Sequence, residues 1–111
     1  MTVDRESSTH VPLLRALLFT DLCDSTLLVE RIGDAAAAGL FQQDVRLVLG
    51  LQERWVGRQI DRSDGLFLLF ERPIDALGFA LDYQQGLRVL GAGNGVVLHA
   101  RAGLHVGEVI L

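Results

Sequence analysis

The apolar and polar positions along this chain predict secondary structure in the order β-α-α-β-β-α-β. The first element is the stretch LLRALLFTDL, residues 13–22, which is rich in apolar residues over its whole length. Such a run is typical of a central strand that is covered on both faces. It ends beside Asp21, and the sequence therefore raises the question of what lies beyond this carboxylate.

Two helices follow, and a glycine separates them. Leu28 and Ile32 lie four residues apart, as on one helical face, and Gly33 ends this helix. Asp34 is placed to cap the next helix. That helix carries an apolar face with one polar interruption, formed by Phe41, Val45, Val48, Leu49, Gln52 and Trp55.

The second half of the chain begins with a predicted hairpin, GRQIDRSDGLFLLFERP, whose two arms flank the turn pair Asp64-Gly65. Pro73 opens a further helix with apolar residues at roughly helical spacing. The segment GAGNG, residues 91–95, indicates a loop, and residues 96–111 indicate a last strand. This order favours an α+β fold in which helices pack on one face of a sheet.

The size and the ends of the chain bound its organisation. With 111 residues there is room for one domain, and 50% of them are hydrophobic. Residues 1–13 form a polar N-terminal segment, and the domain is predicted to occupy residues 14–111. The last residues, LHVGEVIL, form an apolar strand without a following turn or polar tail. We therefore expect a truncated domain that buries part of its surface against further chain or a partner.

Charge and residue usage exclude several functions. The net charge is −4 and no basic stripe is present, which argues against a nucleic-acid partner. All 10 basic residues are arginine, so a P-loop lysine, a Schiff base and a lysine general base are excluded. The single cysteine, Cys23, fits a reducing cytoplasm. The apolar run 11–22 contains Arg15 and is too short to span a bilayer, so we predict a soluble, cytoplasmic chain without a membrane segment.

Two aspartates are candidates for a metal site. Asp21 ends the first strand, Asp64 lies at the tip of the hairpin, and in this element order the strand can lie beside the hairpin. Two carboxylates on adjacent rigid elements suit a Mg²⁺ ion that carries substrate phosphates, because Mg²⁺ takes few protein ligands. Between Leu22 and Thr26 the backbone enters a helix, and the free N–H groups of a helix N-terminus favour a phosphate.

The same residues also have a purely structural interpretation. Asp24, Ser25 or Thr26 can cap a helix, because each has a short side chain with an oxygen acceptor. Asp64 can be the first turn residue of an Asp-Gly hairpin. The residue types alone leave both interpretations open.

Four stretches of the chain occur in an order that resembles one enzyme family. They are LLFTDLCDSTLLVERIGD, IDRSDGLFLLF, DALGFALDYQQGL and RAGLHVGEV. Together they resemble the class III adenylyl/guanylyl cyclase catalytic domain over residues 14–111, in the order and spacing of its landmarks. The chain is thereby identified as the N-terminal portion of such a domain, with the ferredoxin-like core of nucleotide cyclases. Arg101, in the last stretch, is expected to support the sheet edge rather than contact substrate.

The resemblance implies a purine nucleotide cyclase that works as a homodimer, with its active sites at the subunit interface. Asp21 and Asp64 would be the catalytic, metal-binding aspartates, and Leu22 would offer its backbone carbonyl to a metal ion. Two divalent ions, Mg²⁺ or Mn²⁺, would orient the triphosphate of ATP or GTP, activate the ribose 3′-hydroxyl and stabilise the leaving pyrophosphate. Backbone N–H groups would hold the phosphates along the segment formed by Cys23, Asp24, Ser25 and Thr26.

Three departures from the family pattern qualify this expectation. The family's base-reading lysine or glutamate aligns with Ile60, unless a register shift brings Asp61 or Arg62 to that position. Ser63 replaces the glycine that is usual before the second aspartate. The family's transition-state asparagine and arginine belong downstream of Leu111, so we expect the chain alone to have little activity. The alternative function is a degenerate cyclase domain that dimerises, binds a nucleotide and regulates an attached partner without catalysis.

Overall fold

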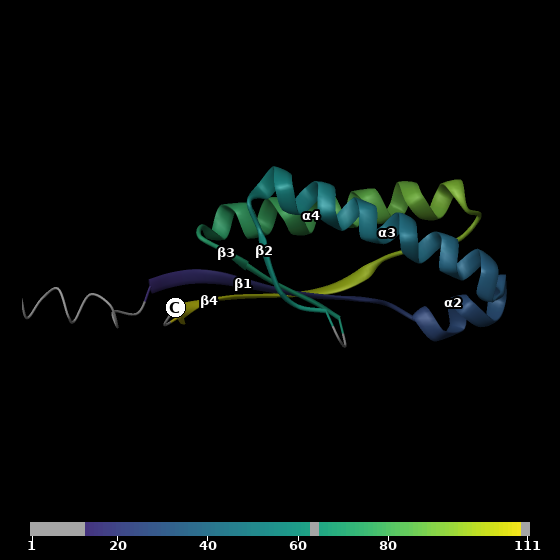
Figure 1. Cartoon of the computed structure of the whole chain (residues 1–111), viewed down its shortest axis with the longest axis horizontal. Helices are drawn as coiled ribbons and strands as arrows, with labels where there is room; N and C mark the ends of the chain where they lie inside the picture. Colours follow the sequence, from purple (N-terminus) through teal and green to yellow (C-terminus); the bar gives the residue numbers. More distant parts are fainter. Residues whose placement is uncertain (1–12, 63–64, 110–111) are drawn as a thin grey trace, which may run out of the picture.

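The computed structural model describes residues 13–62 and 65–109 (Figure 1). Its elements are β1 (Leu13–Leu22), α2 (Ser25–Ile32), α3 (Asp34–Trp55), β2 (Arg58–Asp61), β3 (Leu66–Phe70), α4 (Pro73–Gly93) and β4 (Ala100–Val109). This is the order that the hydrophobic pattern predicts. The predicted polar segment 1–13 lies outside the described residues except for Leu13, and so do Ser63, Asp64 and the last two residues.

The strands form one antiparallel sheet in the order β2-β3-β1-β4. β1 is central: Leu18 lies opposite Leu68 of β3 on one side and Leu104 of β4 on the other. Figure 1 shows α3 and α4 on one face of this sheet, while α2 continues beyond the end of β1. The predicted α+β fold, with helices on one face of a sheet, is confirmed.

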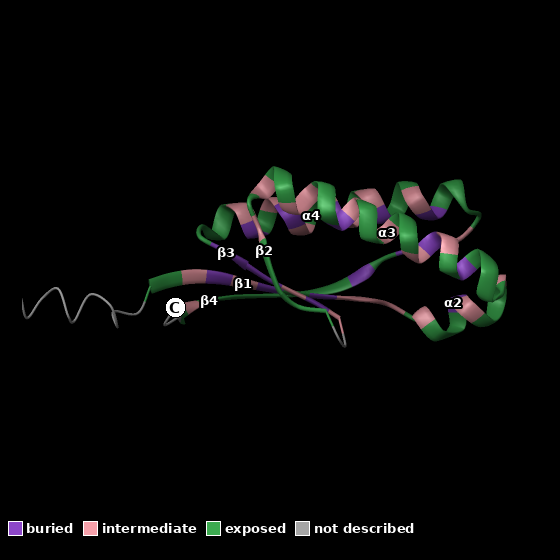
Figure 2. Cartoon of the chain, in the orientation of Figure 1, coloured by how far each residue is buried: buried purple, intermediate pink, exposed green. Residues whose placement is uncertain are grey.

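Within the described residues, helices cover β1 on one face only, so the cover that the sequence predicts for both faces is found on one of them. Ala16, Leu18 and Thr20 are buried, at 0%, 1% and 2% exposure. The alternate residues Leu17 and Phe19 lie on the opposite face, because successive side chains of a strand point to opposite sides. Figure 2 shows that the burial varies along the ribbon of β1. Phe19 is 39% exposed there. Both faces carry apolar side chains, but in the described part of the chain only one of them is covered by helices.

The core lies between the covered face and the two long helices. Phe79 of α4 packs on Phe70 of β3, with ring centroids 5.6 Å apart. Tyr83 follows one turn later, 5.9 Å from Phe79. Leu40 and Val48 of α3 belong to the same buried cluster. The apolar faces of both helices therefore meet on β1 and β3, as the helical spacing of the sequence predicts.

Two glycines of α4 allow α3 to approach closely. A Cβ at Gly78 would lie 2.5 Å from the ring of Trp55, and one at Gly86 would lie 2.7 Å from the Leu47 side chain. Trp55 Nε1 also donates a hydrogen bond to Asp82 Oδ2 at 2.9 Å. The missing side chains make room for α3, and the Trp55 contact fixes the position of one helix along the other.

Three element boundaries differ from the prediction. Asp34 is the first residue of α3 rather than its cap, and Gly33 holds the N-cap position with φ +87°. Residues 91–93 of the expected loop continue α4, so that the turn comes at Asn94. β4 begins at Ala100 rather than at residue 96. Glycine in the last turn of a helix is weakly disfavoured, and packing overrides this preference here.

The two long helices are α3, of 22 residues, and α4, of 21 residues. Pro73 begins α4, as predicted, because its fixed φ suits the first turn. Within the described ranges, neither helix nor any other combines the length and apolar character that crossing a membrane requires.

Candidate functional site

Asp21 lines a cavity at the end of the sheet. This cavity has a volume of about 510 Å³ and is bounded by the end of β1, the start of α2, the long helices and the β2–β3 hairpin. We call it the site cavity; its lining residues are Thr20, Asp21, Leu22, Ser25, Phe41, Asp44, Val48, Arg62, Gly65, Leu66 and Tyr83. The Asp21 side chain is 35% exposed, so a ligand in the cavity can reach its carboxylate.

The loop from β1 to α2 turns sharply beside Asp21. Asp24 occupies the N-cap position of α2 in the left-handed region, with φ 55°, and its side chain makes no capping hydrogen bond to this helix. Left-handed backbone is costly for most residues but tolerated by aspartate. The N–H of Cys23 donates to the carbonyl of His99 at 3.0 Å. This bond ties the loop to the segment before β4.

The first turn of α2 presents the remaining N–H groups of the predicted phosphate segment. The first amides of any helix lack an intrahelical acceptor, and at this end those of Ser25 and Thr26 are among them. Ser25 lines the site cavity, whereas Thr26 is exposed. Since the Cys23 amide is engaged, donors for an anion at this end of α2 would come from residues 24–26.

The β2–β3 hairpin borders the same cavity. Asp64, the second predicted metal ligand, lies outside the described residues, as does Ser63. Their neighbours Arg62 and Gly65 both line the site cavity together with Asp21. Within the described ranges, His, Cys, Asp and Glu side chains form no group of three or more that could hold a metal ion. Of the two aspartates predicted to bind metal, Asp21 lies within the described residues and Asp64 does not.

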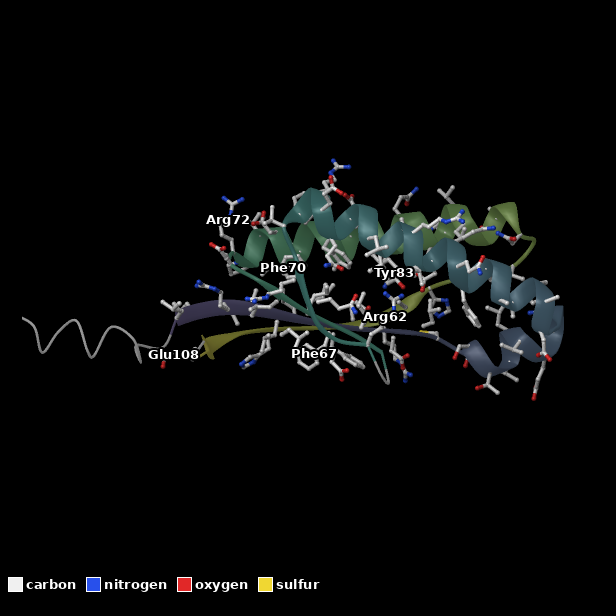
Figure 3. All side chains as sticks on the ribbon, viewed as in Figure 1. Arg62, Phe67, Phe70, Arg72, Tyr83 and Glu108 are labelled. Atoms are coloured by element: carbon white, nitrogen blue, oxygen red, sulfur yellow. The ribbon has the colours of Figure 1, made fainter. Side chains whose placement is uncertain are left out.

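The inner wall of the site cavity carries a polar pair that sequence reasoning missed. Tyr83 Oη of α4 donates to Asp44 Oδ1 of α3 at 2.8 Å. Burial raises the pKa of the Asp44 carboxyl, while the hydrogen bond from Tyr83 and the charge of Arg62 oppose this shift. Burial and the charge of Asp44 also raise the pKa of Tyr83, which remains a protonated donor. Figure 3 shows Arg62 and Tyr83 close together between the hairpin and the helices.

A signal for this pair was present in the sequence. Asp44 lies three residues after Phe41 and four before Val48, on the apolar face of its helix. A carboxylate at such a position is buried by the packing of the helix and needs a partner there. Tyr83 falls on the apolar face of α4, and its hydroxyl supplies that partner.

The position of Ile60 is changed by an irregularity in β2. Gln59 pairs with Leu68 and Asp61 with Phe67, so that a register shift lies between Gln59 and Asp61. Ile60 is 54% exposed. Asp61 accepts a hydrogen bond from the Arg62 N–H at 2.8 Å. The bulge therefore brings Asp61, rather than Ile60, opposite Phe67.

Arg101 contacts Asp21 across the sheet. Its Nη2 lies 3.1 Å from Asp21 Oδ2, and the two residues are direct partners in the β1–β4 register. Arg101 lies on the edge strand β4, and its guanidinium contacts the carboxylate that is predicted to bind metal.

The open face of the sheet carries a second, apolar cavity. Its volume is about 390 Å³, and it is lined by Leu17, Phe19, Phe67, Gly103, Leu104 and His105. The rings of Phe19 and Phe67 meet edge to face, with centroids 6.1 Å apart. Phe19 lies directly opposite Phe67 in the β1–β3 register, so both side chains are on this face of the sheet. This apolar surface lies on the side of the sheet opposite to α3 and α4.

The sequence matches no protein-family model and no curated protein, but solved structures share its fold. The guanylate cyclase domain of RhGC from Catenaria anguillulae, solved in complex with GTP, aligns with a TM-score of 0.74 at 17% identity, over 86% of this chain and 57% of that one. The adenylyl cyclase CyaB from P. aeruginosa aligns with a TM-score of 0.76 at 16% identity, over 88% and 58%. The adenylate/guanylate cyclase/hydrolase from Silicibacter pomeroyi gives 0.72 at 20% identity, over 91% and 60%.

The chain therefore has the fold of nucleotide cyclase catalytic domains, and at the level of fold the resemblance to this family is confirmed. It spans less than two thirds of the length of these structures, between 57% and 60%. This coverage agrees with the predicted N-terminal portion of such a domain.

Proposed function

We propose that this chain is the metal- and phosphate-binding part of a purine nucleotide cyclase domain. The assembled domain would convert ATP or GTP to a 3′,5′-cyclic nucleotide and pyrophosphate in the cytoplasm. The observation that carries the proposal is Asp21, a partly exposed carboxylate at the end of a buried strand, which lines a cavity of about 510 Å³ beside the start of α2. The fold supports it, because one structure with this fold is a guanylate cyclase domain in complex with GTP.

The available donors fit hard divalent ions. The carboxylate of Asp21, the main-chain carbonyl of Leu22 and the carboxylate of Asp64 are oxygen ligands of the kind that Mg²⁺ and Mn²⁺ prefer. Arg62 and Gly65 flank residues 63–64 and line the cavity of Asp21, which supports a shared centre. Two bound ions would neutralise the triphosphate and activate the ribose 3′-hydroxyl.

The start of α2 would receive the phosphates. Asp24, Ser25 and Thr26 offer N–H groups and hydroxyls at a helix N-terminus, where the helix dipole favours an anion. The left-handed conformation of Asp24 turns the chain at this point, and the bond from the Cys23 N–H to His99 keeps the loop fixed on the sheet. Cys23 thus orients the phosphate segment rather than contacting the phosphate through its own amide.

Asp61 is the candidate that would read the purine base. The bulge in β2 favours it over Ile60, since it pairs with Phe67, a residue that lines the open-face cavity. A carboxylate can accept from two neighbouring donors, as N1–H and the 2-amino group of guanine provide, whereas adenine places an acceptor beside its amino group. We therefore expect GTP to be preferred over ATP.

The open face supports assembly as a homodimer. Leu17, Phe19 and Phe67 line an apolar cavity of about 390 Å³ on this face, and Phe19 is 39% exposed. An apolar patch of this kind on a folded chain marks an interaction surface. A second copy would cover it and bring Asp61 of one protomer toward the nucleotide held by its partner.

One observation favours a second function, that of a regulatory module without catalysis. Arg101 donates to Asp21, and a guanidinium at this position would neutralise a carboxylate that does not bind metal. The chain also contains no lysine among its 10 basic residues. In this alternative the domain dimerises and binds a nucleotide, and it regulates an attached partner.

The test uses the longest product of the gene, incubated with GTP or ATP and Mn²⁺. Wild type should form cyclic GMP faster than cyclic AMP, and Asp61→Ala should reduce the preference for GTP. The double variant Asp21→Asn, Asp64→Asn should lower the rate by more than about 100-fold, the scale expected for losing organised charge at a reacting centre. Asp34→Asn is the matched control, because this aspartate lies at the start of α3 and does not line the site cavity.

Two results would decide against the enzyme. Product formation that survives the Asp21, Asp64 double variant would rule out the proposed site. No product from either nucleotide, in protein shown to be folded and dimeric, would favour the regulatory module.

A further inference from the structure

Arg101 forms an ion pair with Asp21, whose carboxylate the proposed metal site requires. It lies on β4 directly opposite Asp21 of β1 in the antiparallel register. Directly opposite side chains of such strands lie on the same face of the sheet. Arg101 Nη2 donates to Asp21 Oδ2 at 3.1 Å. The contact is thus set by the pairing of two long strands and does not depend on a loop.

The geometry of this pair is that of a weak, accessible ion pair. One guanidinium nitrogen contacts one carboxylate oxygen, and the side chains are 74% and 35% exposed. A single contact at such exposure stabilises far less than a buried, bidentate pair. The Arg101 guanidinium neutralises Asp21, and a divalent cation that binds the carboxylate more tightly can displace it.

We propose that Arg101 is a built-in counter-ion of Asp21 that competes with divalent cations for this carboxylate. The inference rests on the proposed metal site. A divalent ion on Oδ2 would lie a few ångströms from the guanidinium, and two cations at that distance repel each other. Metal binding therefore has to displace Arg101 or to use only the other oxygen. In either case Arg101 lowers the metal affinity of Asp21.

The opposite role makes the opposite prediction. A residue that hydrogen-bonds a metal-binding carboxylate can orient it and thereby strengthen metal binding. In that case, loss of Arg101 would weaken binding, whereas competition requires that its loss strengthen binding. The sign of the change in Kd therefore separates the two roles.

The experiment measures Mn²⁺ binding to this chain without nucleotide, by electron paramagnetic resonance of the free ion. It compares wild type with Arg101→Gln, Arg101→Lys, Asp21→Asn and the double variant Arg101→Gln, Asp21→Asn. The matched control is Arg88→Gln, which makes the same change of net charge at an exposed arginine of α4 that contacts Gln85. Circular dichroism checks that each variant is folded.

Competition predicts that Arg101→Gln lowers the Kd for Mn²⁺ by roughly two- to five-fold, as expected for the loss of an exposed ion pair. Arg101→Lys, which keeps the charge, and Arg88→Gln should retain the wild-type Kd. In the Asp21→Asn background, Arg101→Gln should have no further effect. The difference between wild type and Arg101→Gln should shrink as salt is raised, because salt screens the exposed pair.

An unchanged or higher Kd in Arg101→Gln would overturn the inference. Mn²⁺ binding that persists in Asp21→Asn, or that is absent from every variant, would overturn it too. These outcomes differ from a failure of the proposed enzyme. If the chain shows the predicted series of Kd values but the protein forms no cyclic nucleotide, the proposed catalytic function is wrong and the counter-ion role of Arg101 stands.

Discussion

The covered face of the sheet and its open face are built from alternate residues of the same strands. On the covered face, Leu18 and Phe70 are each 1% exposed under α3 and α4. On the open face, Phe19 is 39% exposed. The side chains are similar, and only their cover differs. Apolar side chains on a face thus indicate that the face is to be buried. The arrangement of the helices decides which face is buried within the chain.

The largest expected effect comes from the same substitution on the two faces. Phe70→Ala should lower the free energy of unfolding by about 3–5 kcal/mol, because it leaves a cavity in a close-packed core. Phe19→Ala should cost about 1 kcal/mol, because part of this ring is already in water, but it should weaken self-association. Urea unfolding of dilute protein measures both values. Equal losses would contradict the distinction between the faces.

The next effect concerns the helix layer that covers the sheet. Gly78→Ala should destabilise the chain by about 1–3 kcal/mol, because the new methyl group meets the Trp55 ring. Gly93→Ala is the control in the same helix, where a Cβ has no described atom within 4 Å. It should be neutral or stabilise, since alanine is the better helix former. Thermal unfolding compares the two, and a harmless Gly78→Ala would mean that the helices can shift apart.

A smaller, pH-dependent effect on stability is expected from the hydrogen-bonded pair Asp44 and Tyr83, which lies between α3 and α4. Burial raises the pKa of Asp44 above 3.8, so the folded state holds this proton more tightly than the unfolded state does. The contribution of Asp44 to stability therefore falls as pH rises from 3.8 through the folded pKa. Asp44→Asn retains an acceptor for Tyr83 and removes this loss, so its stability relative to wild type should rise over that window.

Unfolding curves recorded across this pH range provide the check. A stability of Asp44→Asn that falls relative to wild type as pH rises would mean that attraction to Arg62 outweighs the cost of burying the carboxylate. Tyr83→Phe should destabilise at neutral pH, because it removes the donor to Asp44.

The smallest effect lies outside both faces, at the end of α3. Val56 adopts a left-handed conformation with φ 56° and is 72% exposed. A β-branched residue is strained there, so Val56→Gly should stabilise the chain by about 1 kcal/mol. Val89→Gly, at an exposed position inside α4, should instead destabilise by about 1 kcal/mol. Differential scanning calorimetry should resolve shifts of opposite sign, and shifts of equal sign would contradict the assigned strain.

The order of elements could be predicted from the sequence, because helical and strand periodicities differ along the chain and Pro73 marks a helix start. The sequence predicts cover on both faces of β1, and the described part of the chain supplies it on one face, because the apolar run at residues 13–22 is the same whether a helix or a partner buries it. The extension of α4 over residues 91–93 was also missed. Glycine indicates a loop by propensity, and tertiary packing outweighs this small preference.

The candidate site was predictable in part. Asp21 was located from the end of an apolar run, and the structure puts it on a cavity. Asp44 was missed because its burial depends on the packing of α3 against α4, which a one-dimensional pattern shows only as a polar residue on an apolar stripe. The contact of Arg101 with Asp21 depends on strand register, and the bulge beside Ile60 changes which residue faces Phe67. Neither is encoded in local spacing.

We propose that the open face pairs with a second copy of the chain, and sedimentation equilibrium tests this pairing most directly. The mass of one chain is 12.1 kDa. We expect a dimer in wild type and a folded monomer in Phe19→Asp, because a charge at the centre of an apolar interface is costly to bury. A wild-type chain that remains monomeric up to about 100 µM, a concentration at which even micromolar affinity gives a dimer, would contradict this pairing.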